Sequence, residues 1–258
     1  MLACFDVDGV LVEVSESYFR AMAETVSSYI RRPVSRELLL NLKFSLNLNN
    51  DWDATLAGIL FYLSRKNFEE FVEETLPGPP DFRKFYAMAE ARGISLPDYR
   101  ELIEKFESYY RQFRDSETLN ISPAALEEIR KLARVMAVIT GRTREDLAYT
   151  FEKFSLYRYF DHLITEDDLP EIGARKPSAR PLKLLFERCG QVHPAFYVGD
   201  TLADRQMVEN FNRENKQSVF FILFRNASNR GLKADFYAGN EQELRQAIKI
   251  IYSRHKFI

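Results

Sequence analysis

This sequence has few cysteines, no long apolar run and a net charge close to zero. The two cysteines, Cys4 and Cys189, are too few for a disulfide framework, and we expect both to be free packing residues. No apolar run approaches the roughly 18–20 residues that span a bilayer, so we expect no membrane partner. With 36 basic and 38 acidic residues the net charge is -2, which argues against bulk electrostatic binding of nucleic acid.

Two further signatures are missing. The sequence contains no Gly-x-x-x-x-Gly-Lys loop, which argues against a P-loop enzyme driven by ATP. His162, His193 and His255 are scattered without the spacing of metal ligands, so we expect structural or surface roles for them. An acidic motif begins at residue 6, where a signal peptide would lie, and the few cysteines suit a reducing compartment. We therefore expect a cytoplasmic protein.

The sequence does have a pair of acids directly after its first apolar run. Residues 2–5 indicate a buried strand, and Asp6, Asp8 and Gly9 follow it. In a strand, residues i and i+2 point to the same side, so the two carboxylates would lie together. Such a pair is destabilising unless a cation or a proton lies between them. The pattern therefore indicates a site that binds a metal ion and performs chemistry.

Other polar motifs follow apolar runs or lie between two of them. They are Thr140-Gly141, Lys176-Pro177, and Gly199-Asp200 with Asp204. The carboxyl ends of parallel strands meet at one edge of a sheet, and active sites of such folds lie outside that edge. We therefore expect these groups to share one site with the first two acids.

The periodicity of the chain changes twice. Apolar residues recur at helical spacing over residues 15–119, interrupted by breakers such as the proline cluster at 77–80. Before and after this span, short apolar strands alternate with helices. We therefore predict an α/β fold, in which residues 1–14 and 120–258 form a Rossmann-like parallel sheet with helices on both faces. Residues 15–119 would be an all-helical cap domain inserted after the first strand.

In their residues and their order, the four motifs resemble those of the haloacid dehalogenase (HAD) superfamily of phosphohydrolases and phosphotransferases. The helical insertion directly after the first motif looks like that superfamily's type 1 cap. The resemblance covers the whole chain and is to the phosphatase branch, phosphoglycolate phosphatases included. The insertion is longer than a minimal four-helix cap, so cap residues do not transfer from better-known relatives.

The resemblance implies roles that also make chemical sense. Asp6 would be the nucleophile that takes a phosphoryl group as an aspartyl-phosphate. Asp8 would be the general acid and base. Mg²⁺ would be held by Asp6, by Asp200 and by the backbone carbonyl of Asp8, because magnesium prefers carboxylates, water and phosphate oxygens.

Two motifs would contact the transferring phosphate. The resemblance implies hydrogen bonds from the Thr140 hydroxyl and the Gly141 amide. Lys176 would neutralise the charge on the phosphate and on Asp6. Arg142 completes the Thr-Gly-Arg motif, and its planar guanidinium suits a second phosphate or a carboxylate on the substrate. Arg142 could equally face solvent at the start of the following helix.

Asp204 has two open interpretations. It could take part in the metal site, directly or through water. The run from Thr201 to Asp204 also matches a helix capping box, in which Asp204 satisfies the helix N-terminus. Both roles could hold together.

A polar cluster in the predicted cap includes Lys43, Asn49 and Asn50. Asparagines beside an aspartate normally mark a turn and a helix cap. The cluster could also form the loop that selects the substrate. We therefore expect at least one of the three to contact it.

The sequence thus predicts a Mg²⁺-dependent phosphomonoester hydrolase that acts on a small phosphorylated metabolite through an aspartyl-phosphate. A phosphotransferase or phosphomutase of the same superfamily is the alternative, because the same two acids serve either reaction. A non-catalytic metabolite-binding protein on this fold is the third possibility. The particular substrate, and the choice between monomer and homodimer, stay open.

Overall fold

A computed structural model describes residues 1–76, 80–215, 218–226, 229 and 231–254. The chain divides into two units, one made of Met1–Glu13 and Thr118–Ile258 and the other of Val14–Glu117. These limits lie within two residues of the boundaries expected from the periodicity. Residues 77–79 of the proline cluster and His255 lie outside the described residues.

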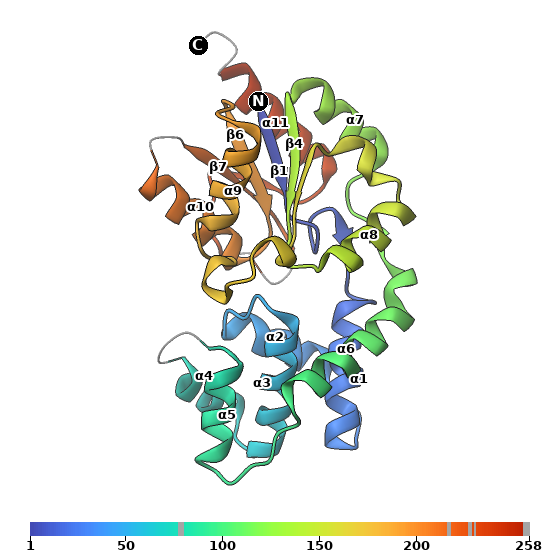
Figure 1. The fold of residues 1–258 in the computed structure, drawn as a ribbon, viewed down its shortest axis with the longest axis vertical. Helices are drawn as coiled ribbons and strands as arrows, with labels where there is room; N and C mark the ends of the chain where they lie inside the picture. Colours follow the sequence, from blue (N-terminus) through green and yellow to red (C-terminus); the bar gives the residue numbers. More distant parts are fainter. Residues whose placement is uncertain (77–79, 216–217, 227–228, 230, 255–258) are drawn as a thin grey trace. The chain divides into compact units, whose positions relative to one another are not determined.

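The first unit is built on a six-stranded sheet in which every paired strand is parallel. Its strands, in spatial order, are β5 (His162–Ile164), β4 (Val135–Ile139), β1 (Leu2–Phe5), β6 (Ala195–Gly199), β7 (Val219–Phe224) and β8 (Phe236–Ala238). The first strand of the chain is therefore central, paired with β4 on one side and β6 on the other (Figure 1). This arrangement confirms the predicted parallel α/β sheet.

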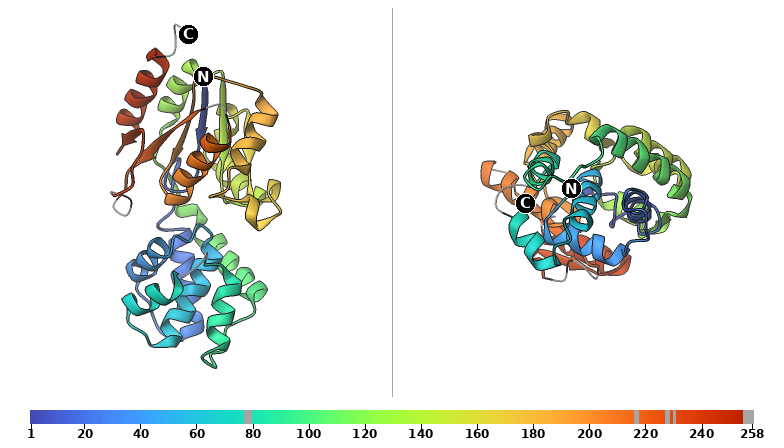
Figure 2. Two further views of the ribbon diagram at one scale, coloured as in Figure 1. Left: turned by 90° about the vertical axis from the view of Figure 1, so that its left-hand side faces the viewer. Right: turned by 90° about the horizontal axis from the view of Figure 1, so that it is seen from below.

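Helices cover both faces of this sheet (Figure 2). They are α7 (Pro123–Leu132), α8 (Arg144–Lys153), α9 (Arg180–Cys189), α10 (Leu202–Glu214) and α11 (Glu241–Arg254). The α9 and α10 helices pack against one face of the sheet. Leu182 of α9 and Met207 of α10 lie in the same buried cluster as Leu2 and Cys4, which are every second residue of β1. The next residue along β1, Phe5, lies on the opposite face, because side chains alternate across a strand.

Both cysteines are free, as expected. Cys4 is fully buried in that core cluster, and Cys189 is partly buried against it.

Local sequence explains where the sheet helices begin. The side chains of Ser122, Thr143 and Thr201 each accept a hydrogen bond from a backbone N–H one turn into the following helix. Pro123 is the first residue of α7. Proline has no N–H, and an N–H at this position would have no partner within the helix, so proline fits there.

The second unit is helical. Its helices are α1 (Tyr18–Ile30), α2 (Arg36–Ser45), α3 (Asp51–Ser64), α4 (Phe68–Thr75), α5 (Phe82–Glu90) and α6 (Tyr99–Phe113). The most apolar of them, α3, buries eight consecutive residues from Ala54 to Phe61. Tyr18 of α1 stacks on Tyr110 of α6, with ring centroids 4.1 Å apart. Within the described parts of the chain, no helix combines the length and the apolar character needed to cross a membrane.

A small antiparallel ribbon lies where the chain leaves and re-enters the sheet unit. It pairs β2 (Val12–Glu13) with β3 (Thr118–Leu119), so that Glu13 lies opposite Thr118. The backbone N–H of Asn120 also donates to the carbonyl of Leu11.

Candidate active site

The first motif forms a tight turn at the carboxyl end of β1. The Asp6 N–H donates to the carbonyl of Val198 in the neighbouring strand, which extends the sheet by one residue. The carbonyl of Val7 then accepts hydrogen bonds from three successive N–H groups, those of residues 10–12. Gly9 has φ +73°, and a β-carbon added there would lie 2.3 Å from Asp200 Oδ2. Glycine therefore lets the turn pass directly over the Asp200 carboxylate.

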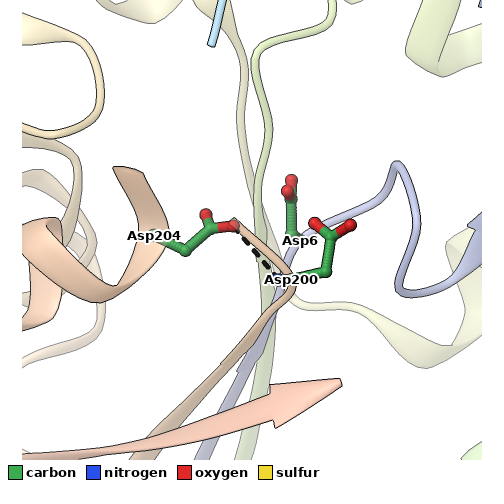
Figure 3. Close-up of side chains that lie close together, drawn as sticks. All are labelled: Asp6, Asp200 and Asp204. Atoms are coloured by element: carbon green, nitrogen blue, oxygen red, sulfur yellow. Dashed lines mark hydrogen bonds between the residues drawn. The ribbon is translucent and has the colours of Figure 1, made fainter. Parts of the chain in front are cut away.

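Asp6, Asp200 and Asp204 lie together at this edge of the sheet (Figure 3). Each is buried, and each offers a carboxylate oxygen within 4.8 Å of the others. Three carboxylates held this close repel one another, and an all-oxygen donor set suits a hard divalent cation such as Mg²⁺. The donor set therefore fits the ion that the resemblance implies.

Lys176 partly balances this negative charge. Its Nζ lies 3.0 Å from Asp6 Oδ1 and 2.7 Å from Asp204 Oδ1, and its side chain is only 4% exposed. Burial opposes its charged form, but the two carboxylates outweigh burial and raise the pKa of Lys176. Burial, with help from the Asp204 and Asp8 carboxylates, raises the pKa of Asp6 to about 7, although Lys176 opposes the shift.

Asp204 already accepts several hydrogen bonds. Its Oδ1 accepts from Lys176 at 2.7 Å and from the Tyr197 hydroxyl at 2.9 Å. Its Oδ2 accepts from the N–H of Asp200 at 3.2 Å, and from the N–H and hydroxyl of Thr201 at 3.1 and 2.6 Å. The capping box of α10 is therefore present. Burial alone would raise the pKa of Asp204, but Lys176 and these donors lower it.

Asp8 has different surroundings from Asp6. Its side chain is 32% exposed, and its Oδ1 accepts from Nε and Nη2 of Arg142 at 2.8 and 2.6 Å. The Arg142 side chain is 1% exposed, and its Nη1 donates to the hydroxyl of Thr150 on α8. The guanidinium that the sequence suggested for substrate contact, or for solvent, therefore points inward and engages the second acid.

Thr140 and Gly141 lie directly after β4. Thr140 is 2% exposed, and its hydroxyl oxygen accepts a hydrogen bond from the N–H of Arg142 at 3.1 Å. Its own N–H donates to the carbonyl of Ile164 in β5. Gly141 is exposed. The Thr-Gly-Arg segment thus carries both a candidate phosphate contact and the partner of Asp8.

Sequence reasoning missed two asparagines that contact Asp200. Nδ2 of Asn226 donates to Asp200 Oδ2 at 3.0 Å, and Nδ2 of Asn229 donates to the Asp200 carbonyl at 2.8 Å. Each asparagine also accepts the other's backbone N–H on its Oδ1. The available signal was a pair of asparagines three residues apart, of which the first lies two residues after the apolar run of β7.

The three cap candidates lie in the helical unit and have structural partners there. Lys43 is 9% exposed and forms an ion pair with Asp51, with Nζ 2.5 Å from Oδ1. Asn50 caps α3, because its Oδ1 accepts from the N–H groups of residues 52 and 53. Asn49 is partly buried. Their contact with substrate stays a prediction.

Fold and site together define a parallel α/β protein with an acidic, metal-type site at the carboxyl edge of its sheet. A family model for haloacid dehalogenase-like hydrolases matches residues 1–212. The chain therefore belongs to the haloacid dehalogenase-like hydrolases.

Solved structures with the same fold cover the chain almost completely. Phosphatase Tt82 from Thermococcus thioreducens is 25% identical with a TM-score of 0.69, and the match covers 96% of this chain and 99% of that one. A predicted phosphoglycolate phosphatase from Haemophilus somnus is 15% identical with a TM-score of 0.64, over 95% of this chain and 96% of that one.

One curated protein is similar over a shorter region. It is an imidazoleglycerol-phosphate dehydratase from Phytophthora nicotianae, which is 28% identical over an alignment of 207 residues; the match covers 77% of this chain. The match spans 39% of that protein's length. The similarity thus concerns about two fifths of the relative.

Proposed function

We propose that the protein is a Mg²⁺-dependent phosphatase that hydrolyses a small phosphomonoester through an aspartyl-phosphate on Asp6. One observation carries the proposal: the buried Asp6 carboxylate lies at the end of the central strand, 3.0 Å from the Lys176 ammonium and within the carboxylate cluster. A nucleophile so placed attacks a phosphorus atom whose negative oxygens need positive charge nearby. Similarity to phosphatase Tt82 supports the same reaction class.

The reaction has two steps. In the first, an Asp6 oxygen forms a bond to phosphorus, the bond from phosphorus to the leaving oxygen breaks, and that oxygen takes a proton from Asp8. In the second, water attacks the same phosphorus, gives a proton to Asp8, and the bond to Asp6 breaks. Inorganic phosphate and the free carboxylate of Asp6 result, so Asp8 ends in the protonation state in which it began.

Lys176, Thr140 and Gly141 bind the transferring group in this proposal. The ammonium of Lys176 compensates negative charge on the phosphoryl oxygens, and Asp204 holds Lys176 in place through its 2.7 Å contact. The Thr140 hydroxyl and the Gly141 amide lie at the end of the neighbouring strand, where they can donate to phosphate oxygens.

Asp6 and Asp200, with the backbone carbonyl of Asp8, would hold Mg²⁺. When bound, the ion supplies positive charge that draws the phosphate to the acidic cluster and stabilises the charge of the transition state. Asp204 is the weaker candidate for a direct ligand, because both of its oxygens already accept protein hydrogen bonds. We assign it to positioning Lys176 and capping α10.

Release of inorganic phosphate from a panel of small phosphomonoesters tests this function. The panel includes p-nitrophenyl phosphate and is assayed with and without Mg²⁺, with Asp6→Asn as the matched control. We expect Mg²⁺-dependent release by the wild type alone. A hydroxylamine-sensitive phosphoenzyme in a rapid acid quench would identify the acyl phosphate.

The same assay decides between the alternatives. Transfer of the phosphoryl group to an added alcohol or sugar phosphate in preference to water would favour a phosphotransferase or phosphomutase. Substrate binding without release or transfer would favour a non-catalytic metabolite-binding protein.

A further inference from the structure

We propose that Arg142 is a positioning residue that fixes the direction of the general acid, Asp8, and is not a substrate ligand. The inference rests on the proposed phosphatase function, because it assigns a partner to the acid of that reaction. It differs from the substrate contact that the Thr-Gly-Arg motif suggested.

Arg142 is buried much more deeply than the acid that it contacts. The Arg142 side chain is 1% exposed, whereas the Asp8 side chain is 32% exposed. A buried guanidinium is strongly disfavoured unless carboxylates or other acceptors surround it. Asp8 and Thr150 supply such acceptors, so Arg142 already has structural partners on the protein side.

The guanidinium of Arg142 holds one oxygen of Asp8 through two hydrogen bonds. Nε and Nη2 of Arg142 both donate to Oδ1 of Asp8, at 2.8 and 2.6 Å. Two donors from one rigid plane fix the carboxylate more tightly than one flexible ammonium would. Since both bonds end on Oδ1, the proton that Asp8 gives to the leaving oxygen must travel from Oδ2.

Arg142 is itself held in place by two threonine hydroxyls. Its Nη1 donates to the hydroxyl of Thr150, which is fully buried on α8. Its backbone N–H donates to the Thr140 hydroxyl, the candidate phosphate contact, at 3.1 Å. One residue thus links the orientation of the acid to the segment that would hold the phosphate.

In the proposed reaction, Arg142 holds the Asp8 carboxyl in one direction while the leaving group departs. Asp8 protonates that oxygen as its bond to phosphorus breaks, and the electron pair of the broken bond takes up the proton. A leaving group that is stable as an anion, such as p-nitrophenolate, needs this proton little. Phenolate, whose conjugate acid has a pKa of about 10, needs it far more.

A series of aryl phosphates therefore tests the inference through kcat/KM, which covers the steps up to departure of the leaving group. For Arg142→Ala we expect kcat/KM with phenyl phosphate to fall about 30- to 100-fold, and with p-nitrophenyl phosphate to change less than about threefold. The slope of log kcat/KM against leaving-group pKa should steepen.

Two further variants keep the test decisive if Arg142→Ala does not fold. Arg142→Lys retains the charge but lacks the two donors in one plane, and should lower kcat/KM with phenyl phosphate about tenfold. Thr150→Val removes the acceptor of Nη1 and should lower kcat/KM with phenyl phosphate by a smaller factor, again with little effect on p-nitrophenyl phosphate. Arg144→Ala is the matched control, because this arginine is 68% exposed and pairs with Asp168.

Equal losses with every aryl phosphate would overturn the inference while leaving the phosphatase function intact. A rise in KM at constant kcat for the whole series would do the same, and would restore Arg142 as a substrate ligand. No phosphate release by the wild type from any compound would overturn the proposed function and this inference with it.

Discussion

Asp6 and Asp8 are two residues apart in the sequence, yet the structure gives them opposite surroundings. Asp6 is buried among two carboxylates and Lys176. Asp8 is partly exposed, and its Oδ1 accepts two hydrogen bonds from the buried guanidinium of Arg142. Two identical side chains thus differ in burial and in their charged neighbours. Such a difference allows one site to hold both the proposed nucleophile, Asp6, and the proposed general acid, Asp8.

Replacing each acid should separate their roles most strongly. We expect Asp6→Asn to lower turnover of every substrate by about 10⁴-fold or more, because no carboxylate remains to accept the phosphoryl group. Asp8→Asn should lower kcat/KM about 10²–10³-fold for phenyl phosphate but far less for p-nitrophenyl phosphate. Equal profiles for the two variants would contradict the division of roles.

The lysine beside Asp6 should come next in effect. Lys176→Met leaves the buried carboxylates of Asp6 and Asp204 without their shared cation. We expect activity to fall about 10²–10³-fold and the free energy of unfolding to fall by about 3–5 kcal/mol.

Its sequence neighbour provides the control. Arg175 pairs with Glu166, at 2.5 Å from Nη1 to Oε1, and its side chain is 29% exposed. Arg175→Ala should therefore keep nearly full activity. Similar losses in both variants, measured by phosphate release and urea denaturation, would argue against a specific role for Lys176.

The surroundings of Asp6 also predict a pH dependence of stability in metal-free protein. Its pKa is raised from 3.8 to about 7, so between these pH values the native state binds a proton that the unfolded state has released. Stability therefore falls as pH rises through this range. Asp6→Asn removes this titration and should gain stability over the wild type by up to about 4 kcal/mol between pH 4 and 7. Urea denaturation in EDTA measures the difference, and parallel pH curves would contradict it.

The smallest effect should come from Asn226, the asparagine that contacts Asp200 in the proposed metal site. Asn226 donates to Oδ2 of Asp200, so Asn226→Ala should weaken Mg²⁺ affinity about tenfold by loosening that carboxylate. The rise in melting temperature with added Mg²⁺ gives the affinity without an activity assay. Asn215→Ala, which alters a hydrogen bond at the other end of α10, should leave the Mg²⁺ response unchanged.

The sheet could be predicted because each strand is a short apolar run that ends in a polar motif, such as β4 before Thr140. The helical character of residues 15–119 was also predicted, but the separate helices from Phe68 to Thr75 and from Phe82 to Glu90 were not. They have only eight and nine residues, and each buries just two of them, so their separate limits are hard to recognise within a long helical span. Tertiary contacts, more than local pattern, hold such helices in place.

Within the site, residue types could be predicted but directions could not. From the sequence, Arg142 was expected to contact the substrate or to face solvent. In the fold, its Nη1 donates to the hydroxyl of Thr150, one turn from the end of α8, so the guanidinium points inward. Asn226 reaches Asp200 from a loop 26 residues later in the chain, a relation that spacing does not reveal. Long-range contacts of this kind need the folded backbone.

The small ribbon of β2 and β3 has a consequence for how such a protein can be rebuilt. Since Glu13 and Thr118 lie opposite one another, the sheet unit itself holds the two ends of the inserted segment next to each other. Paired antiparallel residues have α-carbons about 5 Å apart, a gap that a two-residue hairpin turn closes. An insertion of another length that starts and ends at this junction therefore needs little additional loop-closure entropy.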